Sequence, residues 1–379
     1  MPLPDASLFD EGEILDGLLR WVAIESPTYD AAAVNRMMSA AARDLAEIGA
    51  RIETLPGQEG YGDIVLARFA GRTAGPGILV LAHLDTVHLV GTLERGLPMR
   101  RDGDRYYGPG IYDMKGGTYI AYQAMRQLLR SEGAPTLPVT FMLIPDEEIG
   151  SPTTRARIEA EARANKYVLV PEPAQDKGNL ITGRWAFARF FLKASGQPAH
   201  AGANLGTGRS AIREMAEQIP RIETMSRPED NVVFTVGKVH GGTYSNVVPT
   251  ECSAEMLAIA ETQADLDQVR AQMMALGPLN EGIAFTVTEG PVRPLFEASE
   301  ETMRMYELAR DLSREAGYEV GHGSVGAGSD GNFTGALGIP TLDGLGVCGD
   351  GFHTLGEHIL VSSLVPRARV FGGLLSELR

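Results

Sequence analysis

Cysteine and long apolar runs are what this sequence most lacks. Its 379 residues include only two cysteines, Cys252 and Cys348, which form neither a zinc-finger spacing nor a disulfide framework. This scarcity fits a reducing environment, so we expect a cytoplasmic protein. No stretch approaches the roughly 20 apolar residues that a membrane span needs. The acidic N-terminal segment 1–13 also lacks the apolar core of a signal peptide.

Positive charge is also in short supply. The 34 lysines and arginines are outnumbered by 49 aspartates and glutamates, which gives a formal net charge of −15. Nucleic acids and anionic membrane surfaces repel such a chain, so we expect neither as a partner. The excess leaves carboxylates available as metal ligands. With 44% apolar and 22% charged residues the composition is that of a globular protein, and the length favours two domains.

The most unusual stretch is 139–150, where an apolar strand pattern runs directly into Asp146, Glu147 and Glu148. Three adjacent negative charges at the mouth of a buried strand repel one another and lose hydration. That arrangement is costly unless a cation is present or one acid stays protonated. We therefore expect Glu148 to bind a metal and Glu147 to handle a proton, with Asp146 supporting the loop.

Other candidate ligands also follow apolar strands or lie in glycine-rich loops. They are His83 after 77–82, Asp113 within 108–117, Glu172 after 167–170 and His353 within 346–354. Taken alone, His83 also fits a polar strand end, and Asp113 also fits a helix N-cap. Asp85, two residues after His83, is suited to orient its imidazole. Because ligand sites of open parallel sheets lie outside the carboxyl ends of the strands, we expect these groups to converge.

The pattern of the sequence changes at about residue 185. Residues 1–184 and 293–379 predict an α/β domain in which a mixed, largely parallel sheet is sandwiched by helices. Residues 185–292 read as β-α-β-β-α-β, the order of a small two-layer α+β domain of ferredoxin-like type. The sequence thus predicts a discontinuous first domain that is interrupted by an inserted second one.

Seven motifs, taken together and in this order, resemble the M20 family of co-catalytic metallopeptidases, especially its glutamate carboxypeptidase and acetylornithine deacetylase branches. They are 83–87, 110–117, 145–150, 172–173, 196–202, 246–249 and 351–354. The resemblance covers nearly the whole chain. It implies a di-metal catalytic domain and an inserted domain, 185–292, that serves both as a lid and in homodimerisation.

The resemblance also implies roles for the residues of the site. Two zinc ions per subunit would be bridged by Asp113 and a water molecule; His83 and Glu172 would bind one ion, and Glu148 and His353 the other. Asp85 would brace His83, and Glu147 would be the general base. The charges of this set balance, because the four positive charges of two zinc ions equal the four negative charges of three carboxylates and a hydroxide. Nitrogen and oxygen ligands are also compatible with Mn or Co.

The resemblance also implies roles for residues of the inserted domain and for three residues that follow it in the chain. In relatives, a histidine of the partner subunit's inserted domain stabilises the oxyanion, and His200 is the matching position, although a solvated turn histidine is the alternative. Arg293 matches a family arginine and would bind a substrate carboxylate, although a surface arginine at a hinge fits equally. Asn246 would add a hydrogen bond, and Gly328 with Ser329 would form the wall of the site. Another arginine of many relatives is replaced here by Ile259.

We therefore expect a di-zinc hydrolase that cleaves an amide bond next to a free carboxylate. Its substrates would be small N-acyl amino acids or short peptides, so it would be a carboxypeptidase or an N-acyl-amino-acid amidohydrolase, with glutamate or aspartate as the favoured leaving group. Within this class the alternative is a deacetylase that releases acetate. The sequence is also compatible with a single-metal hydrolase. A non-catalytic binding protein is disfavoured, because all five ligand positions and Glu147 are present.

Overall fold

The computed structural model describes residues 3–203 and 205–379, and the chain divides into two compact units. Unit 1 consists of Met1–Gly183, Phe296–Val325 and Ser329–Arg379. Unit 2 consists of Arg184–Leu295 and Gly326–Gly328. Unit 2 is therefore formed almost entirely by one continuous segment, which interrupts the chain of unit 1.

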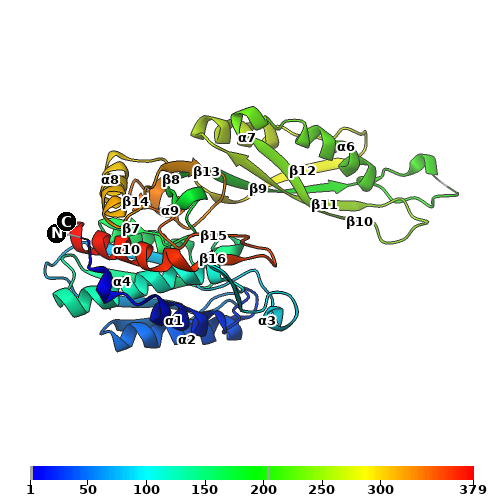
Figure 1. Cartoon of the computed structure of the whole chain (residues 1–379). Coiled ribbons are helices and arrows are strands. Elements are labelled where there is room, and N and C mark those ends of the chain that lie inside the picture. Colours follow the sequence, from blue (N-terminus) through cyan, green and yellow to red (C-terminus); the bar gives the residue numbers. More distant parts are fainter. Residues whose placement is uncertain (1–2, 204) are drawn as a thin grey trace. The chain divides into compact units, whose positions relative to one another are not determined.

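Unit 1 is built on a six-stranded mixed sheet (Figure 1). In spatial order its strands are β1 (Arg51–Leu55), β2 (Ile64–Phe69), β6 (Val139–Ile144), β3 (Ile78–His83), β7 (Tyr167–Leu169) and β14 (Thr341–Leu342). The four strands from β6 to β14 are parallel, whereas β1 and β2 pair antiparallel. The prediction of a mixed sheet with a parallel centre is confirmed.

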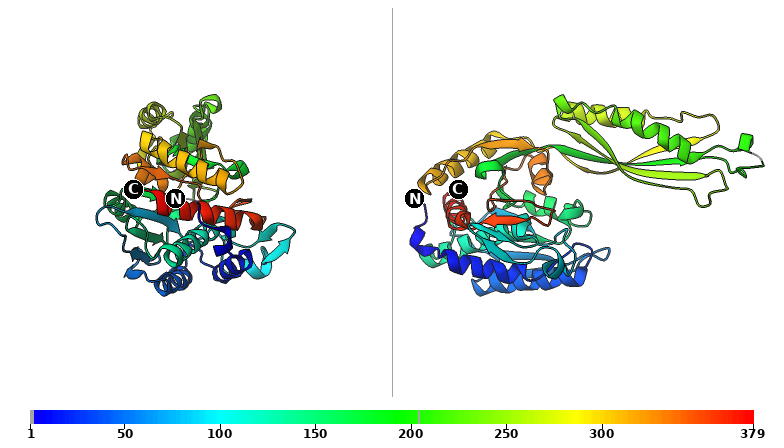
Figure 2. Two further views of the ribbon diagram at one scale, coloured as in Figure 1. Left: turned by 60° about the vertical axis from the view of Figure 1, so that its left-hand side comes forward. Right: turned by 45° about the vertical axis from the view of Figure 1, so that its right-hand side comes forward.

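Helices cover both faces of this sheet. One face packs against α1 (Glu11–Val22), α2 (Ala31–Glu47), α4 (Gly116–Glu132), α8 (Glu300–Glu315) and α10 (Leu364–Glu377), and the other packs against α5 (Arg155–Arg163) and α9 (Gly331–Ala336). Figure 2 shows α1 and α2 side by side in blue. Burial on both faces explains why β3 and β6 read as continuous apolar runs. Within the described residues, no helix is both long and apolar enough to cross a membrane.

Smaller elements complete unit 1. A second sheet has the order β15 (Gly349–Asp350), β16 (His358–Leu360), β5 (Arg105–Tyr107) and β4 (Arg100–Asp102), and a two-stranded sheet joins β8 (Leu180–Arg184) to β13 (His322–Val325). The short helix α3 covers Thr92–Arg95. The pairing of β16 with β5 anchors the loop 351–357 next to the segment that leads into α4.

Unit 2 has two layers. Its elements follow the order β9 (Ala186–Ser195), α6 (Ala211–Glu223), β10 (Val233–Gly241), β11 (Glu251–Ala260), α7 (Gln263–Met274) and β12 (Ala284–Arg293). The four strands form an antiparallel sheet in the spatial order β10-β11-β9-β12. Every second side chain of β9 is buried, and these residues pack against apolar residues of α6 and α7. The alternation arises because the two helices cover only one face of the sheet.

Candidate metal centre

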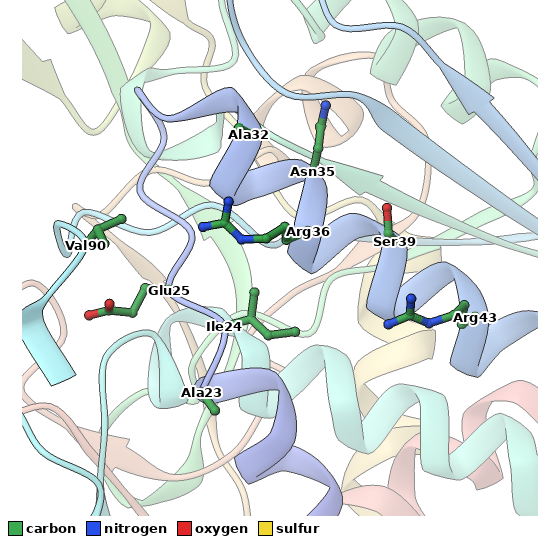
Figure 3. A pocket seen from close by; sticks show the side chains of 9 residues that line it. All are labelled: Ala23, Ile24, Glu25, Ala32, Asn35, Arg36, Ser39, Arg43 and Val90. Carbon is green, nitrogen blue, oxygen red and sulfur yellow. The ribbon is translucent and has the colours of Figure 1, made fainter.

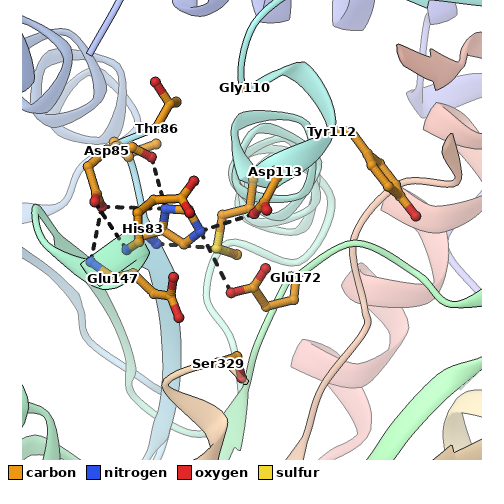
Figure 4. A network of polar contacts seen from close by, with 12 residues as sticks. His83, Asp85, Thr86, Gly110, Tyr112, Asp113, Glu147, Glu172 and Ser329 are labelled. Atoms are coloured by element: carbon orange, nitrogen blue, oxygen red, sulfur yellow. Dashed lines mark hydrogen bonds and ion pairs between the residues drawn. The ribbon is translucent and has the colours of Figure 1, made fainter. Parts of the chain in front are cut away.

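His83 is the last residue of β3, and its imidazole is buried with oxygen atoms on both sides (Figure 4). Its Nδ1 lies 3.0 Å from the backbone carbonyl oxygen of Asp85 and 3.4 Å from Oδ1 of the same residue. Its Nε2 lies 3.2 Å from Oδ1 of Asp113 and 3.7 Å from Oε1 of Glu172. Because oxygen acceptors face both ring nitrogens, the ring must bind either a second proton or a metal ion.

Asp113 lies between two histidines that come from distant parts of the chain. Its Oδ1 faces His83, while its Oδ2 lies 3.2 Å from Nε2 of His353. The same nitrogen of His353 lies 2.9 Å from Oε2 of Glu148. A carboxylate that presents one oxygen to each of two histidines has the arrangement of a bridging ligand.

The donor atoms have the spacing of ligands to a common ion. Four nitrogen–oxygen separations between the histidines and the carboxylates run from 2.9 to 3.7 Å. Two ligands of one tetrahedral zinc ion lie about 3.3 Å apart, given bonds of about 2.0–2.2 Å. Ligand atoms of His83, Asp113 and Glu148 all lie within 4.8 Å of one another. These residues therefore fit a metal centre.

Proton affinities reflect the same attraction between the histidines and the carboxylates. Burial by itself would lower the pKa of His83, but hydrogen bonds to Asp113 and Asp85 raise it well above its usual value. Hydrogen bonds to Asp113 and Glu148 raise the pKa of His353 to about 10. Burial and the charge of Asp113 raise the pKa of Glu148 to about 8. A metal ion that binds here must therefore displace protons.

Asp85 connects three segments of the site. Its Oδ1 accepts the backbone N–H of Glu147 at 3.3 Å, and its Oδ2 accepts the backbone N–H of Glu148 at 3.3 Å. The hydroxyl of Thr28 donates to Oδ2 at 2.7 Å. Since Asp85 also contacts His83, one buried carboxylate holds together the end of β3, the turn after β6 and the segment around Thr28. The sequence predicted only the contact between Asp85 and His83.

The acids that follow β6 have different surroundings. Asp146 is buried and accepts three hydrogen bonds from Thr153 and Thr154 at 2.5 to 2.9 Å, which confirms that it braces the loop. Glu147 instead has a carboxylate oxygen within 4.8 Å of a ligand atom of His83. Its side chain therefore reaches the metal centre.

Two of the predicted residues lie in unit 2 on neighbouring turns. His200 pairs with Val247 in an isolated β-bridge, and the backbone N–H of Ala201 donates to the carbonyl oxygen of Asn246 at 3.0 Å. The side chain of His200 is exposed, and its Nδ1 accepts the backbone N–H of Gly202 at 3.1 Å. These contacts orient the imidazole and bring His200 and Asn246 together.

Arg293 and Gly328 form a second pair in unit 2. Arg293 ends β12 opposite Phe187 of β9, and a Cβ atom at position 328 would lie 3.0 Å from Cδ of Arg293. Ile259 on β11 faces Phe187 from the other side, so Ile259 and Arg293 lie on one face of the sheet, two strands apart. The two pairs are near opposite ends of β9, since the eight steps along the strand from residue 187 to residue 195 span about 26 Å.

Ser329 has both of its hydrogen-bond donors engaged by other residues. It is buried in unit 1, where its backbone N–H donates to Asn332 Oδ1 at 3.0 Å and its hydroxyl donates to Asp343 Oδ2 at 2.6 Å. Both donors are thus engaged within the chain. This geometry does not support Ser329 as a substrate-binding residue, because a buried donor that is already bonded has none to offer a ligand.

A groove of about 650 Å³ lies on another part of unit 1 (Figure 3). Its lining consists of Ala23, Ile24, Glu25, Ala32, Asn35, Arg36, Ser39, Arg43 and Val90. None of the five predicted metal ligands belongs to this lining. Glu25 accepts the backbone N–H of Gly91 at 2.7 Å and that of Leu93 at 2.9 Å, so its carboxylate mainly ties two loops together.

Two residues near the metal centre were missed by the sequence analysis. Thr28 donates to Asp85, and Glu357 accepts the backbone N–H of Asp113 at 3.0 Å. Hydrogen bonds of this kind leave no periodic pattern in a sequence. The only available signal for Glu357 was its position four residues after His353.

Histidine and carboxylate donors that gather at one edge of a mixed sheet and in two adjoining loops can hold metal ions, as in a metal-dependent hydrolase. Residues 79–377 match the sequence model of the peptidase family M20/M25/M40. The chain therefore belongs to this family, whose members are generally metal-dependent, and it is a hydrolase of the metallopeptidase or amidohydrolase type.

Individual relatives agree with this assignment. Carboxypeptidase G2 from Pseudomonas sp. (strain RS-16) is 28% identical over 387 residues, which cover 98% of this chain and 91% of the relative. Succinyl-diaminopimelate desuccinylase from Delftia acidovorans is 25% identical over 336 residues, which cover 83% and 84% of the two chains. The crystal structure of aminopeptidase PepT from Bacillus cereus superposes with a TM-score of 0.77 at 20% identity and covers 98% of this chain and 99% of that one, which shows a shared fold.

Proposed function

We propose that this protein is a di-zinc hydrolase that cleaves an amide bond next to a free carboxylate. The observation that carries the proposal is Asp113, whose two oxygens each lie 3.2 Å from a different histidine. His83 and Glu172 would hold one ion, and Glu148 and His353 the other, with Asp113 shared between them. When bound, the two ions would lower the pKa of a water molecule and polarise the scissile carbonyl.

The residues around the ions would transfer the proton and orient the ligands. Glu147 would take a proton from the attacking water and deliver it to the leaving amine. Its position is supported by the backbone hydrogen bond to Asp85, which keeps the turn after β6 in place. Asp85 would also keep the proton of His83 on Nδ1, because its carbonyl oxygen lies 3.0 Å from that atom. Nε2 of His83 is then available as a ligand.

Unit 2 would be a ferredoxin-like domain that is inserted into the catalytic domain and serves in homodimerisation. His200 and Asn246 lie beyond one end of β9, and Arg293 lies near the other end. A small ligand cannot contact both ends of a segment about 26 Å long. We therefore assign His200, as oxyanion donor, and Asn246 to the site of the partner subunit.

Arg293 would bind the carboxylate of the substrate, with Gly328 leaving room for its side chain. The similarity to carboxypeptidase G2 favours a carboxypeptidase or an N-acyl-amino-acid amidohydrolase. We favour glutamate or aspartate as the leaving amino acid because of the resemblance to the glutamate carboxypeptidase branch of the family. The second candidate, a deacylase such as an N-acetyl-amino-acid deacetylase, is favoured by the similarity to the desuccinylase.

A hydrolysis screen with zinc-loaded protein tests the proposed function. Dipeptides and N-acetyl or N-aryl-acyl amino acids, each with C-terminal Glu, Asp, Ala or Arg, should show release of the free amino acid, fastest for Glu or Asp. Metal analysis should give two zinc ions per chain, and chelation should abolish turnover. Full turnover with fewer than two metals would exclude the two-metal mechanism. A zinc-loaded protein that cleaves none of these substrates would favour a non-catalytic binding protein.

Mixed dimers test the assignment of His200. Chains with His200→Ala and chains with Glu147→Ala should each be nearly inactive alone. If His200 acts in the partner's site, half of randomly mixed dimers contain one complete site, so about a quarter of the wild-type turnover should return. Coexpression of the two chains with different tags provides the measurement. Activity that stays at the sum of the two separate variants would show that the sites are not shared.

A further inference from the structure

Glu357 is a buried carboxylate that lies under the loop of Asp113. Only 1% of its surface is exposed. Its Oε1 accepts the backbone N–H groups of Tyr112 at 2.8 Å and of Asp113 at 3.0 Å, and its Oε2 accepts the backbone N–H of Gly110 at 2.9 Å. Nε2 of the buried His88 lies 2.7 Å from the same Oε2. Four contacts therefore compensate the burial of one acidic group.

The loop 110–113 depends on such an acceptor, because its backbone is irregular. Helix α4 begins only at Gly116, and Asp113 and Met114 have non-helical φ and ψ angles. Helical hydrogen bonds do not satisfy the N–H groups of Tyr112 and Asp113, whereas buried backbone donors require a partner. Glu357 supplies that partner, because its Oε1 accepts both N–H groups while its Oε2 accepts the N–H of Gly110.

Glu357 also links the two loops that carry the histidine and the carboxylate of one metal position. It comes four residues after His353 and directly precedes β16, which pairs with β5. Its carbonyl oxygen accepts the N–H of Gly108 at 3.4 Å, so both its main chain and its side chain contact the segment before α4. A shift of Glu357 would therefore move His353 and Asp113 relative to each other.

We propose that Glu357, held by His88, is a positioning residue that sets the main chain of 110–113 so that Asp113 presents one oxygen to each histidine. The proposal rests on the proposed function, in which Asp113 is the shared metal ligand. Glu357 would touch neither the substrate nor the reacting atoms, and it would act through Asp113 alone. Supporting groups of this kind typically change metal affinity 10- to 100-fold when they are removed.

The test is Glu357→Gln, measured by competition between the protein and a chromophoric chelator for Zn²⁺. The amide keeps the size of the side chain but has one acceptor oxygen instead of two, so part of the loop loses its partner. We expect an affinity for Zn²⁺ lower by about 10- to 100-fold, and a lower kcat at nearly unchanged KM. His88→Leu, which has no donor, removes only the fourth contact and should shift affinity in the same direction by a smaller factor. This second variant keeps the proposal testable if the Glu357→Gln protein fails to fold.

Glu214→Gln is the matched control. Glu214 in unit 2 is also fully buried and also accepts backbone N–H groups, from Leu279 at 2.8 Å and Asn280 at 3.0 Å. This variant should lower thermal stability without changing the affinity for Zn²⁺. The proposal is wrong if folded Glu357→Gln and His88→Leu proteins bind Zn²⁺ as tightly as wild type. If instead wild type itself binds no Zn²⁺, the proposed function fails, and the two failures are thus distinguishable.

Discussion

Replacing Glu147 by glutamine should lower turnover by about 10²- to 10⁴-fold while zinc content stays at the wild-type value. The reason is that Glu147 would transfer a proton rather than hold a metal. Its carboxylate lies within reach of the donor atoms around His83, but the carboxylate that contacts His353 belongs to Glu148. The amide of glutamine cannot accept the proton, so the chemical step is lost and the metal site remains.

The neighbouring acid supplies the control for this prediction. Glu148→Gln changes the residue whose Oε2 lies 2.9 Å from Nε2 of His353, so it should lower zinc affinity as well as turnover. Single-turnover kinetics together with metal analysis separates the two effects. A Glu147→Gln protein that turns over at the wild-type rate would remove Glu147 from the mechanism. Loss of zinc from that variant would instead make Glu147 a ligand.

The convergence of His83, Glu148 and Glu172 could be predicted from the sequence because His83 ends β3, while Glu148 and Glu172 follow β6 and β7. These strands are parallel neighbours, so their carboxyl ends meet at one edge of the sheet. The apolar runs revealed the strands, and the charged residues after them revealed the edge. The apolar runs and the charged residues after them were thus enough to predict where three of the five candidate ligands meet.

Asp113 and His353 required more than strand patterns, because both lie in irregular loops. The sequence left open whether Asp113 is a helix N-cap. The structure excludes that alternative, since Lys115 occupies the N-cap position of α4 and Asp113 faces two histidines. His353 has a φ of 61°, a left-handed conformation that is rare for residues other than glycine. Its loop geometry depends on contacts such as those of Glu357, which no local pattern reveals.

The residues assigned to the substrate were the hardest to predict. Ser329 was expected in the wall of the site, and no sequence pattern indicated that both of its donors are engaged by Asn332 and Asp343. The pairing of Arg293 with Gly328 arises between segments 35 positions apart, and it depends on the packing of Gly328 against the end of β12. Single-sequence reasoning finds candidate residues by type, whereas their engagement with other groups is decided by tertiary contacts.

The affinity for Zn²⁺ should increase at least tenfold for each pH unit between pH 6 and 8. Each metal position contains one histidine whose pKa is raised, His83 in one and His353, with a pKa of about 10, in the other. Zinc must displace at least one proton from each position, so affinity follows the inverse of proton concentration. Glu148, with its pKa raised to about 8, adds a further proton over the same range.

The stability of the metal-free protein should change in the opposite direction. The folded-state pKa values of His353 and Glu148 both exceed their ordinary values of 6.5 and 4.5. Each contribution is therefore fully present below the ordinary value and is lost as pH rises, up to about 8 for Glu148 and about 10 for His353. The melting temperature in chelator should fall from pH 6 to 9, while the increase caused by Zn²⁺ becomes larger.

Chelator competition at pH 6, 7 and 8 and thermal unfolding at pH 6, 7, 8 and 9 measure the two trends. His240→Gln, which changes an exposed histidine of unit 2, should leave both slopes unchanged. His353→Gln should reduce the pH dependence of Zn²⁺ affinity, because it removes a group that must lose a proton before the metal binds. An affinity that is independent of pH would contradict the direct histidine–carboxylate contacts around Asp113, since those contacts are what raise the pKa of both histidines.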